Sequence, residues 1–420
     1  MSFQQGLSGL NASSKNLEVI GNNIANANTF GTKSSRAEFA DVYAAALNGS
    51  GTASVGIGTR LAAVAQQFTQ GNVTTTENPM DLAINGAGFF QVSDGRSPVT
   101  YTRNGQFKID RDGFIVNNGQ ERLMGYAADG NGVIQAGQAV ALQLPTGGID
   151  PNPTSSASIE VNLDSRTAIT LPPAVPMIDF ANANTYNNAT SLTVYDAKGQ
   201  DVAMSFYFQK AGNDQWNVFA TSNGATVGGT AAAPTPLTTI QFQSNGSGPI
   251  TPSGPISFDV PASVNAVGAQ TEPILGMLFD LSGATQFGSA YGVTDIRQDG
   301  YSAGLLSAIA IESNGIVTAR YSNGQSKPSG QIEIANFRNP QGLQPLGDNA
   351  WARTHASGDP VIGVPGEGNL GVLQAGALEE SNIDLTGELV NMITAQRVYQ
   401  ANAQTIKTQD QVLQTLVNLR

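Results

Sequence analysis

Apolar side chains recur at alternating steps of four and three residues near both ends of the chain. At the N-terminal end the stripe consists of Phe3, Leu7, Leu10, Leu17 and Ile24. At the C-terminal end it consists of Leu385, Leu389, Met392, Tyr399, Ala403, Ile406, Leu413 and Val417. This spacing places each stripe on one side of an α-helix, as in coiled coils. It predicts one helix over residues 3–27 and another over about 385–419.

Each predicted helix has a narrow apolar seam that two kinds of packing could cover. The seam could face the helix's own domain, or it could join helices of different copies. The stripes lie outside the middle of the chain, and their other faces carry Asn, Gln, Ser and Thr rather than Lys and Glu. We therefore expect a coiled-coil layer between copies. Its assembly interface would be formed by Phe3, Leu7, Leu10, Leu17, Ile24, Leu385, Leu389, Met392, Tyr399, Ile406 and Leu413.

The residues between the two stripes follow a β pattern instead. Asx-Gly pairs interrupt short apolar or alternating runs between residues 82 and 144. Such pairs are typical of hairpin turns, because both residues tolerate positive φ. Further strands are predicted near 191–195, 201–209 and 215–221, and Asn-Gly hairpins return after residue 300. The middle of the chain is therefore expected to be antiparallel β structure.

The order of these segments is roughly palindromic, which predicts nested domains. We expect a helical domain from 1–28 and 381–420, a middle β domain from 71–145 and 296–380, and an outer β domain inserted at 146–295. The expected fold class is mixed and mainly β, with terminal helices and two nested β-rich domains that are barrel- or sandwich-like. The alternative is three independent β domains in a row.

Two shorter segments connect these domains. Residues 29–70 contain a short apolar stretch and a Gly/Ser run without a clear period, which predicts an extended arm or linker. Ser381 and Asp384 form an S-x-x-D pattern just before the last predicted helix. This pattern predicts a capping box at its start.

The composition adds a contrast between the ends and the middle of the chain. Charged residues make up only 12% of the chain, against about 25% for an average soluble domain. The net charge of −12 lies in the middle, because the charges of both predicted helices cancel. Low charge suits surfaces stacked beside copies of themselves, although an ordinary extracellular β-protein could share it. No basic cluster is present to neutralise phosphates, which argues against nucleic-acid binding.

The sequence gives little indication of targeting or redox environment. The chain has no cysteine, so it has no disulfide or thiolate site. The N-terminal residues lack the basic and continuous apolar regions of a cleavable signal peptide. No run of 18 apolar residues is present, so membrane insertion is not expected. Secretion would therefore need a route without such a signal.

Residues suited to catalysis or metal binding are scarce. The only histidine, His355, lies in an irregular polar stretch, so a surface or turn position is the simpler interpretation. Residues 366–371 match G-x-G-x-x-G, but the flanking pattern lacks the strand and helix of a dinucleotide site. Residues 110–113 resemble half of a calcium loop without its remaining ligands. We therefore predict no enzyme activity, no catalytic or metal site, and no cofactor.

Four stretches resemble one protein family. Residues 16–29 (NLEVIGNNIANANT) resemble the N-terminal signature of the bacterial flagellar rod and hook proteins. Residues 30–41 (FGTKSSRAEFAD) are most similar to the hook members, and residues 84–92 (INGAGFFQV) resemble the family's core β motif. Residues 381–420 resemble its terminal helix nearly throughout. Residues of about 150–295 show only a weak likeness.

The resemblance implies a structural subunit of the flagellar hook, located in the bacterial flagellum with the basal body and outside the cell. Many copies would self-assemble into a curved helical tube that links the rod to the filament and transmits torque as a universal joint. The terminal helices would surround a central channel, and export would use the flagellar type III apparatus. The distal rod protein, the hook–filament junction protein and the hook cap would be partners. A hinge between the layers would lie at Gly49, Gly51, Gly56 and Gly58.

Other functions remain open at this point. A distal rod protein shares both ends, but it is typically shorter and lacks so large an insertion. An enzyme carried on an axial protein would need catalytic residues that the sequence does not offer. An adhesin could use residues 150–295 to bind a surface.

Overall fold

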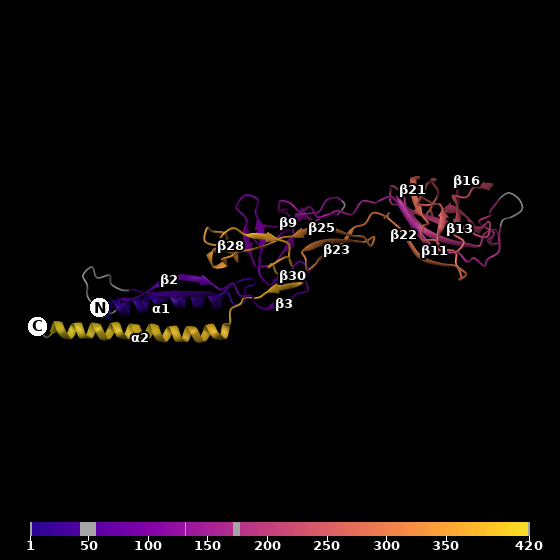
Figure 1. Cartoon of the computed structure of the whole chain (residues 1–420). Coiled ribbons are helices and arrows are strands. Elements are labelled where there is room, and N and C mark those ends of the chain that lie inside the picture. Colours follow the sequence, from indigo (N-terminus) through magenta and orange to yellow (C-terminus); the bar gives the residue numbers. More distant parts are fainter. Residues whose placement is uncertain (1, 43–55, 131, 171–176, 419–420) are drawn as a thin grey trace. The chain divides into compact units, whose positions relative to one another are not determined.

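The computed structural model describes residues 2–42, 56–130, 132–170 and 177–418, and the chain folds as two compact units. The first unit comprises Met1–Thr146, Ala308–Arg320 and Ser326–Arg420. The second comprises Gly147–Ser307 and Tyr321–Gln325. Both chain ends therefore belong to the first unit, and the second is inserted into it (Figure 1).

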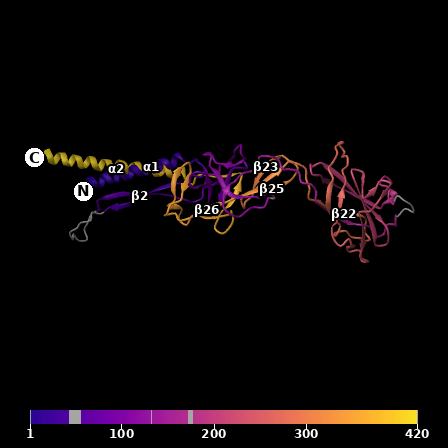
Figure 2. The same ribbon diagram turned by 90° about the horizontal axis from the view of Figure 1, so that it is seen from above.

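Two long helices, α1 (Ser2–Ala25) and α2 (Leu385–Asn418), pack side by side in the first unit (Figures 1 and 2). They run antiparallel, since Gly6 of α1 lies against Ile406 of α2 and Gly9 lies against Asn402. A Cβ atom at Gly6 would lie 3.1 Å from Ile406 Cγ1, and one at Gly9 would lie 2.9 Å from the Asn402 amide. The missing side chains at these positions therefore allow the helices to approach closely.

The ends of both helices have local causes. After α1, Gly31 adopts the left-handed conformation with a φ of 74°, which favours glycine. At the start of α2, Asp384 Oδ1 accepts a hydrogen bond from the Thr386 N–H (3.0 Å) and caps the helix. The Ser381 hydroxyl accepts instead from the Ile383 N–H (3.2 Å), so the predicted capping box does not form. Neither described helix is long and apolar enough to cross a membrane.

The arm after α1 is a hairpin rather than a simple extended linker. Strands β1 (Ser35–Val42) and β2 (Gly58–Gln66) pair antiparallel, and both contact α1. Asn23 of α1 pairs with the backbone at the start of β1. Its side chain donates to the Ser35 carbonyl (2.8 Å) and accepts from the Ser35 N–H (2.9 Å). The sequence did not predict this hairpin, because β1 alternates only between half-buried and exposed positions and β2 alternates irregularly.

The rest of the first unit is β structure. Its strands are β3 (Val73–Thr75), β4 (Leu82–Asn85), β5 (Phe89–Ser93), β6 (Thr100–Thr102), β7 (Lys108–Ile109), β8 (Ile115–Val116), β9 (Arg122–Ala127), β10 (Val140–Ala141), β23 (Leu306–Ile311), β24 (Ile316–Tyr321), β25 (Ser326–Ile332), β26 (Ile334–Asn336), β27 (Gln344–Gly347), β28 (Ala350–Ala352), β29 (Val361–Gly363), β30 (Val372–Ala375) and β31 (Ala377–Glu379). A short 3₁₀ turn, Pro340–Gly342, precedes β27.

Strands from both sides of the insertion pair with each other. β9 pairs with β25, β5 with β26 and β6 with β28, all antiparallel. Adjacent residues of β5 point to opposite faces of the sheet. Phe90 therefore packs on Phe107 in one core, with ring centroids 5.2 Å apart, and Phe89 packs near Trp351 in another, at 5.8 Å. This shared sheet excludes three independent β domains in a row.

The second unit is also built from strands. They are β11 (Ser156–Asn162), β12 (Asn188–Tyr195), β13 (Asp201–Lys210), β14 (Gln215–Ser222), β15 (Ala225–Val227), β16 (Gly229–Thr230), β17 (Ala233–Pro234), β18 (Thr238–Phe242), β19 (Pro249–Thr251), β20 (Ile256–Val260), β21 (Ile274–Asp280) and β22 (Gly292–Gln298). A 3₁₀ turn, Ala183–Thr185, precedes β12.

Two sheets pack face to face in the second unit. One has the order β20-β21-β11-β22 and the other β12-β13-β14-β18-β19. Phe206 of one stacks on Phe279 of the other, with ring centroids 4.3 Å apart, and Trp216 is fully buried between them. The expected fold class is confirmed in its sandwich-like form, since no sheet among the described residues closes into a barrel.

Candidate assembly surface and buried ion cluster

The buried face of α1 is made of small and polar residues together with one large apolar residue, Ile20. Gly6, Ser13 and Ile20 recur every seven residues and are buried, and Asn23 is buried one turn further on. This line faces α2 and the hairpin, where the close contacts of Gly6 and Gly9 occur. The helix pair within one chain therefore approaches closely at Gly6 and Gly9, with the predicted stripe contributing only in part.

The apolar stripe of α1 lies beside this buried line. Leu7 follows Gly6 directly and Ile24 follows Asn23, so the stripe is turned about 100° around the helix axis. Leu7 is 45% exposed, and Leu10, Leu17 and Ile24 are half-buried. The side chain of Phe3 lies outside the described residues. The chain itself thus leaves Leu7 exposed and covers the other described residues of this stripe only in part.

The predicted stripe of α2 divides between two environments. Met392 and Ile406 are half-buried, and Ile406 faces Gly6 of α1. The other four predicted residues are between 37% and 49% exposed: Leu385, Leu389, Tyr399 and Leu413. The structure therefore uses part of the stripe within the chain and leaves the rest exposed.

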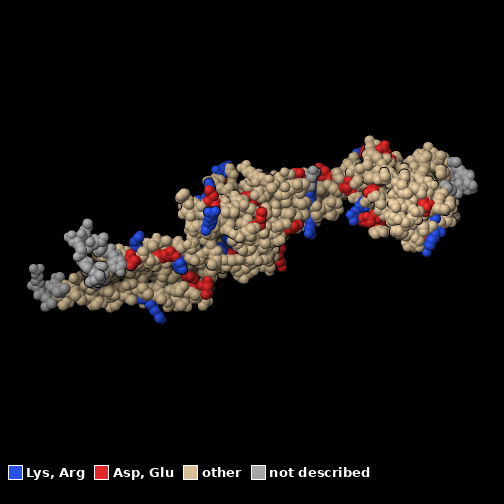
Figure 3. Space-filling view, viewed as in Figure 1, with Lys and Arg blue, Asp and Glu red and all other residues tan. Residues whose placement is uncertain are grey.

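The heptad pattern missed other apolar residues that are exposed on α2. They are Val390, Ile393, Val398 and Val412. Their steps of three, five and fourteen residues do not follow the four- and three-residue steps of the stripe, so the search for that spacing did not select them. The face of the helix pair seen in Figure 3 also carries few charges. Exposed apolar surface of this extent is typical of a protein interface.

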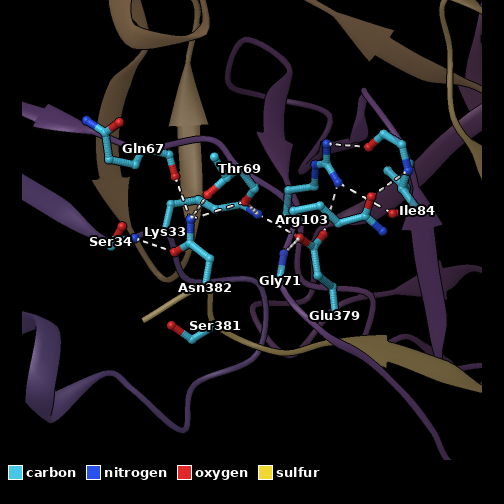
Figure 4. Close-up of polar contacts among 12 residues, drawn as sticks. Lys33, Ser34, Gln67, Thr69, Gly71, Ile84, Arg103, Glu379, Ser381 and Asn382 are labelled. Atoms are coloured by element: carbon cyan, nitrogen blue, oxygen red, sulfur yellow. Dashed lines mark hydrogen bonds and ion pairs between the residues drawn. The ribbon is translucent and has the colours of Figure 1, made fainter. Parts of the chain in front are cut away.

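Three buried charged side chains, Lys33, Arg103 and Glu379, form a cluster between the segment after α1 and the segment before α2, which we call the ion cluster (Figure 4). Lys33 Nζ lies 2.6 Å from Glu379 Oε1, and Arg103 Nη1 lies 3.0 Å from Glu379 Oε2. The Lys33 and Glu379 side chains are 0% exposed and that of Arg103 is 5% exposed. The single carboxylate therefore faces two buried cations.

Backbone groups add further hydrogen bonds to these charges, although the buried Arg103 Nε has no partner among the described residues. Lys33 Nζ also donates to the Thr69 carbonyl (2.8 Å), and Arg103 Nη2 donates to the Gly86 carbonyl (2.9 Å). The Gly71 N–H donates to Glu379 Oε1 (2.8 Å). Burial lowers the pKa of Lys33 below its ordinary value, and the charge of Glu379 opposes that shift. Both effects follow from removing charges from water.

The ion cluster joins segments that are distant in the sequence. Lys33 follows α1, Thr69 and Gly71 follow the hairpin, Arg103 belongs to the β sheet region, and Glu379 ends β31 shortly before α2. Lys33 and Glu379 are 346 positions apart. The exit of α1 and the entry to α2 are thus fixed to the same buried charge.

Asn382 reinforces this junction. Its Oδ1 accepts from the Ser34 N–H (2.7 Å), and its Nδ2 donates to the Gln67 carbonyl (2.8 Å) and to Thr69 Oγ1 (2.8 Å). One side chain before α2 therefore links the start of the hairpin to its end. The sequence alone does not point to Asn382 or the ion cluster, because nothing in one sequence indicates contacts over such separations.

The structure describes two of the four predicted hinge glycines. Gly49 and Gly51 lie outside the described residues. Gly56 and Gly58 lie at the start of β2, where Gln5 Nε2 of α1 donates to the Gly56 carbonyl (2.6 Å) and Ser8 Oγ accepts from the Thr59 N–H (3.3 Å). These bonds attach this part of the hairpin to α1, and a hinge here stays a prediction.

Paired terminal helices with exposed apolar stripes, attached by buried charges to a nested β body, define a structural subunit that assembles with copies of itself. Four family models match the chain in order. They are flagella basal body rod protein (3–33), flagellar hook protein FlgE/F/G D1 domain (83–199), flagellar basal body protein FlaE D2 domain (162–301) and flagellar basal body rod FlgEFG protein C-terminal (374–419).

Full-length relatives identify the family. The chain is 41% identical to flagellar hook protein FlgE of Escherichia coli K12 and 42% identical to that of Salmonella typhimurium LT2, with all of each chain covered. It is 33% identical to FlgE of Borreliella burgdorferi, covering all of this chain and 99% of the relative. The chain belongs to the flagellar hook protein family.

A solved structure agrees with this fold. The crystal structure of Helicobacter pylori flagellar hook protein FlgE2 aligns with a TM-score of 0.54 at 15% identity, covering 73% of this chain and 100% of that one. The chain is therefore a structural subunit of the flagellar hook, as the resemblance implied. Its family is structural rather than enzymatic, forms a homo-oligomeric flagellar assembly with rod-related components, and is located in the hook and basal body.

Proposed function

We propose that copies of this chain assemble through the exposed stripes of α1 and α2 into a curved tube that transmits torque as a universal joint. The observation that supports the interface is the exposure of Leu7, Leu385, Leu389 and Leu413 on helices whose mutual contact uses other residues. Burying such side chains contributes about 1.5–3 kcal/mol each when they are fully removed from water.

The ion cluster supports the mechanical part of the proposal. A joint that transmits torque needs its helical layer attached firmly to the β body, and both helix connections meet at Glu379. The helical layer would surround a central channel, the hairpin would be the arm, and the second unit would be the outer domain. The hinge glycines would allow adjustment between layers during rotation.

Export and partners belong to the same proposal. The chain would leave the cytoplasm through the flagellar type III apparatus without a cleaved signal, and would reach the cell exterior. The tube would contact the distal rod protein at one end and the hook–filament junction protein at the other, with a hook cap during growth. Support for these points comes from the family membership.

The interface is tested by placing a charge in the exposed stripe. Leu389→Asp should abolish assembly while the β units still fold, because an unpaired buried charge costs several kcal/mol in every copy. Gln404→Asp, at an exposed polar position of the same helix, is the matched control and should leave tubes intact. Electron microscopy of purified protein at high concentration gives the readout. Tubes of normal number and shape from Leu389→Asp would contradict the assignment.

A further inference from the structure

A groove of about 620 Å³ lies between α1, the hairpin and α2. Asn16 on α1, Phe39 on β1 and Asn391, Ala395 and Val398 on α2 belong to its lining. The lining residues on α2 extend from Glu388 to Asn402, so the groove follows several turns of this helix. Its walls combine apolar side chains with amide and hydroxyl groups.

Two polar atoms in this groove lack a partner within the described chain. Glu388 Oε2 and Gln67 Nε2 are both buried and make no hydrogen bond there, and both residues line the groove. One atom is an acceptor and the other a donor. Buried polar atoms are normally paired, so an occupant that offers both a donor and an acceptor fits this groove.

The end of α2 has the complementary features. Gly6 faces Ile406 and Gly9 faces Asn402, so the antiparallel α1 begins near residue 410 of α2. The last two turns, Gln411–Asn418, therefore extend beyond α1, and we call them the overhang. Val412 and Leu413 of the overhang are 48% and 49% exposed. Gln411 supplies an amide, which can both donate and accept hydrogen bonds, whereas the Gln414 amide already donates to Asp410 Oδ2 (3.0 Å).

We propose that the groove binds the overhang of a second copy of this chain. A copy cannot fill its own groove, because Val398 and Val412 lie on one straight helix, about 21 Å apart along its axis. Groove and overhang are different surfaces, so the contact is heterologous and repeats without closing into a dimer, as a helical tube requires. The inference rests on the proposed function in that copies must meet through their terminal helices.

Cysteine pairs in this naturally cysteine-free chain test the contact. Asn391→Cys places a thiol in the groove and Val412→Cys places one on the overhang. Within one copy these positions are about 32 Å apart along α2, whereas a disulfide needs Cα atoms within about 7 Å. Any disulfide or short bis-maleimide link must therefore join two copies. Assembled tubes should give a ladder of linked chains on denaturing gels.

The matched control pairs Val412→Cys with Gln400→Cys. Gln400 is nine residues from Asn391, which places it on the opposite side of α2 and outside the groove lining. It should give several-fold less ladder. Equal ladders, or tubes without a ladder, would overturn the groove contact while the proposed function stands. If Asn391→Cys prevents assembly, Asn16→Cys on the α1 wall replaces it. Absence of tubes from the cysteine-free parent would instead overturn the proposed function.

Filling the groove provides an independent test. Ala12 lines the groove and Asn11 beside it is exposed, so Ala12→Trp and Asn11→Trp add the same side chain to neighbouring positions. Ala12→Trp should raise the concentration needed for assembly several-fold, and Asn11→Trp should not. Both monomers should keep the parent's melting temperature. Equal assembly by the two variants would show that no other copy enters the groove.

Discussion

Removing the charge of Glu379 should destabilise the first unit strongly. Lys33 and Arg103 would remain buried without their shared carboxylate. Breaking a buried ion pair by removing one partner typically costs about 3–5 kcal/mol, because an uncompensated charge stays inside. Glu379→Gln keeps the size of the side chain, so the loss would come from the charge. Glu380→Gln changes the next residue, whose carboxylate makes only an exposed contact with Asn72, and should cost at most about 0.5 kcal/mol.

The two tryptophans make the measurement specific to each unit. Trp351 packs in a core of the first unit, and Trp216 packs in the second. In a Trp216→Phe background, the remaining Trp351 fluorescence follows urea unfolding of the first unit. In a Trp351→Phe background, the remaining Trp216 fluorescence follows unfolding of the second unit. Glu379→Gln should lower the urea midpoint of the first unit and leave the midpoint of the second unit unchanged. Equal midpoints for Glu379→Gln and Glu380→Gln would refute the reasoning.

Lys33 should behave differently from Glu379. Lys33→Met should cost less, because Glu379 keeps Arg103 and the Gly71 N–H as partners. Burial lowers the pKa of Lys33 below 10.5, so the unfolded chain binds more protons just below that value. The free energy of unfolding of the first unit should therefore rise with pH in this range, and Lys33→Met should remove the rise. A greater loss from Lys33→Met than from Glu379→Gln would contradict the assigned charge balance.

Three further predictions concern the monomer and its units. Amide exchange of a verified monomer should be fast in α1 and α2 and slow in 85–144, because narrow helices are marginal without partners; strong protection of both helices would contradict this. Deleting 150–303 with a short Gly/Ser linker should still give tubes, straighter or irregularly curved, because Ile149 and Gly304 are hydrogen-bonded neighbours (2.8 Å); aggregation would show a shared core. Burial raises the pKa of Glu333 to about 7, so the folded chain holds a proton that the unfolded chain releases. Unfolding free energy of the first unit should therefore fall by on the order of 3 kcal/mol as pH rises from 4.5 to 7, and Glu333→Gln should abolish this slope in urea titrations.

The elements that depend on local sequence could be predicted. Both helices follow from apolar spacing, and the hairpin turns follow from pairs such as Asp112-Gly113, where Gly113 has a φ of 87°. Nesting followed from the order of segments. The β1–β2 hairpin could not be predicted, because neither strand has a fully buried residue and β2 alternates irregularly.

The sequence predicted the apolar stripe of the candidate site but not the glycine face of α1 or the ion cluster. A search for apolar periodicity finds the leucine stripe but gives no weight to glycine, so the α1 face marked by Gly6 and Gly9 was overlooked. Charged residues are normally assigned to the surface, so Lys33 and Glu379 gave no local signal of burial. Their pairing depends on closure of the whole first unit, which a single sequence does not reveal.

The two faces of α1 have different roles in packing. One face packs within the chain, and the other is proposed to pack against other copies. Gly6, Gly9 and Ser13 offer little apolar surface, and Ile20 is the one large apolar side chain that is buried among residues 4–25 of α1. In the proposed interface, the stripe beside it, with Leu7 45% exposed, would be buried further when another copy arrives. Much of the hydrophobic free energy of the helical layer would then be released between copies. Such a layer should form cooperatively, because a newly added copy gains more from several neighbours than from one.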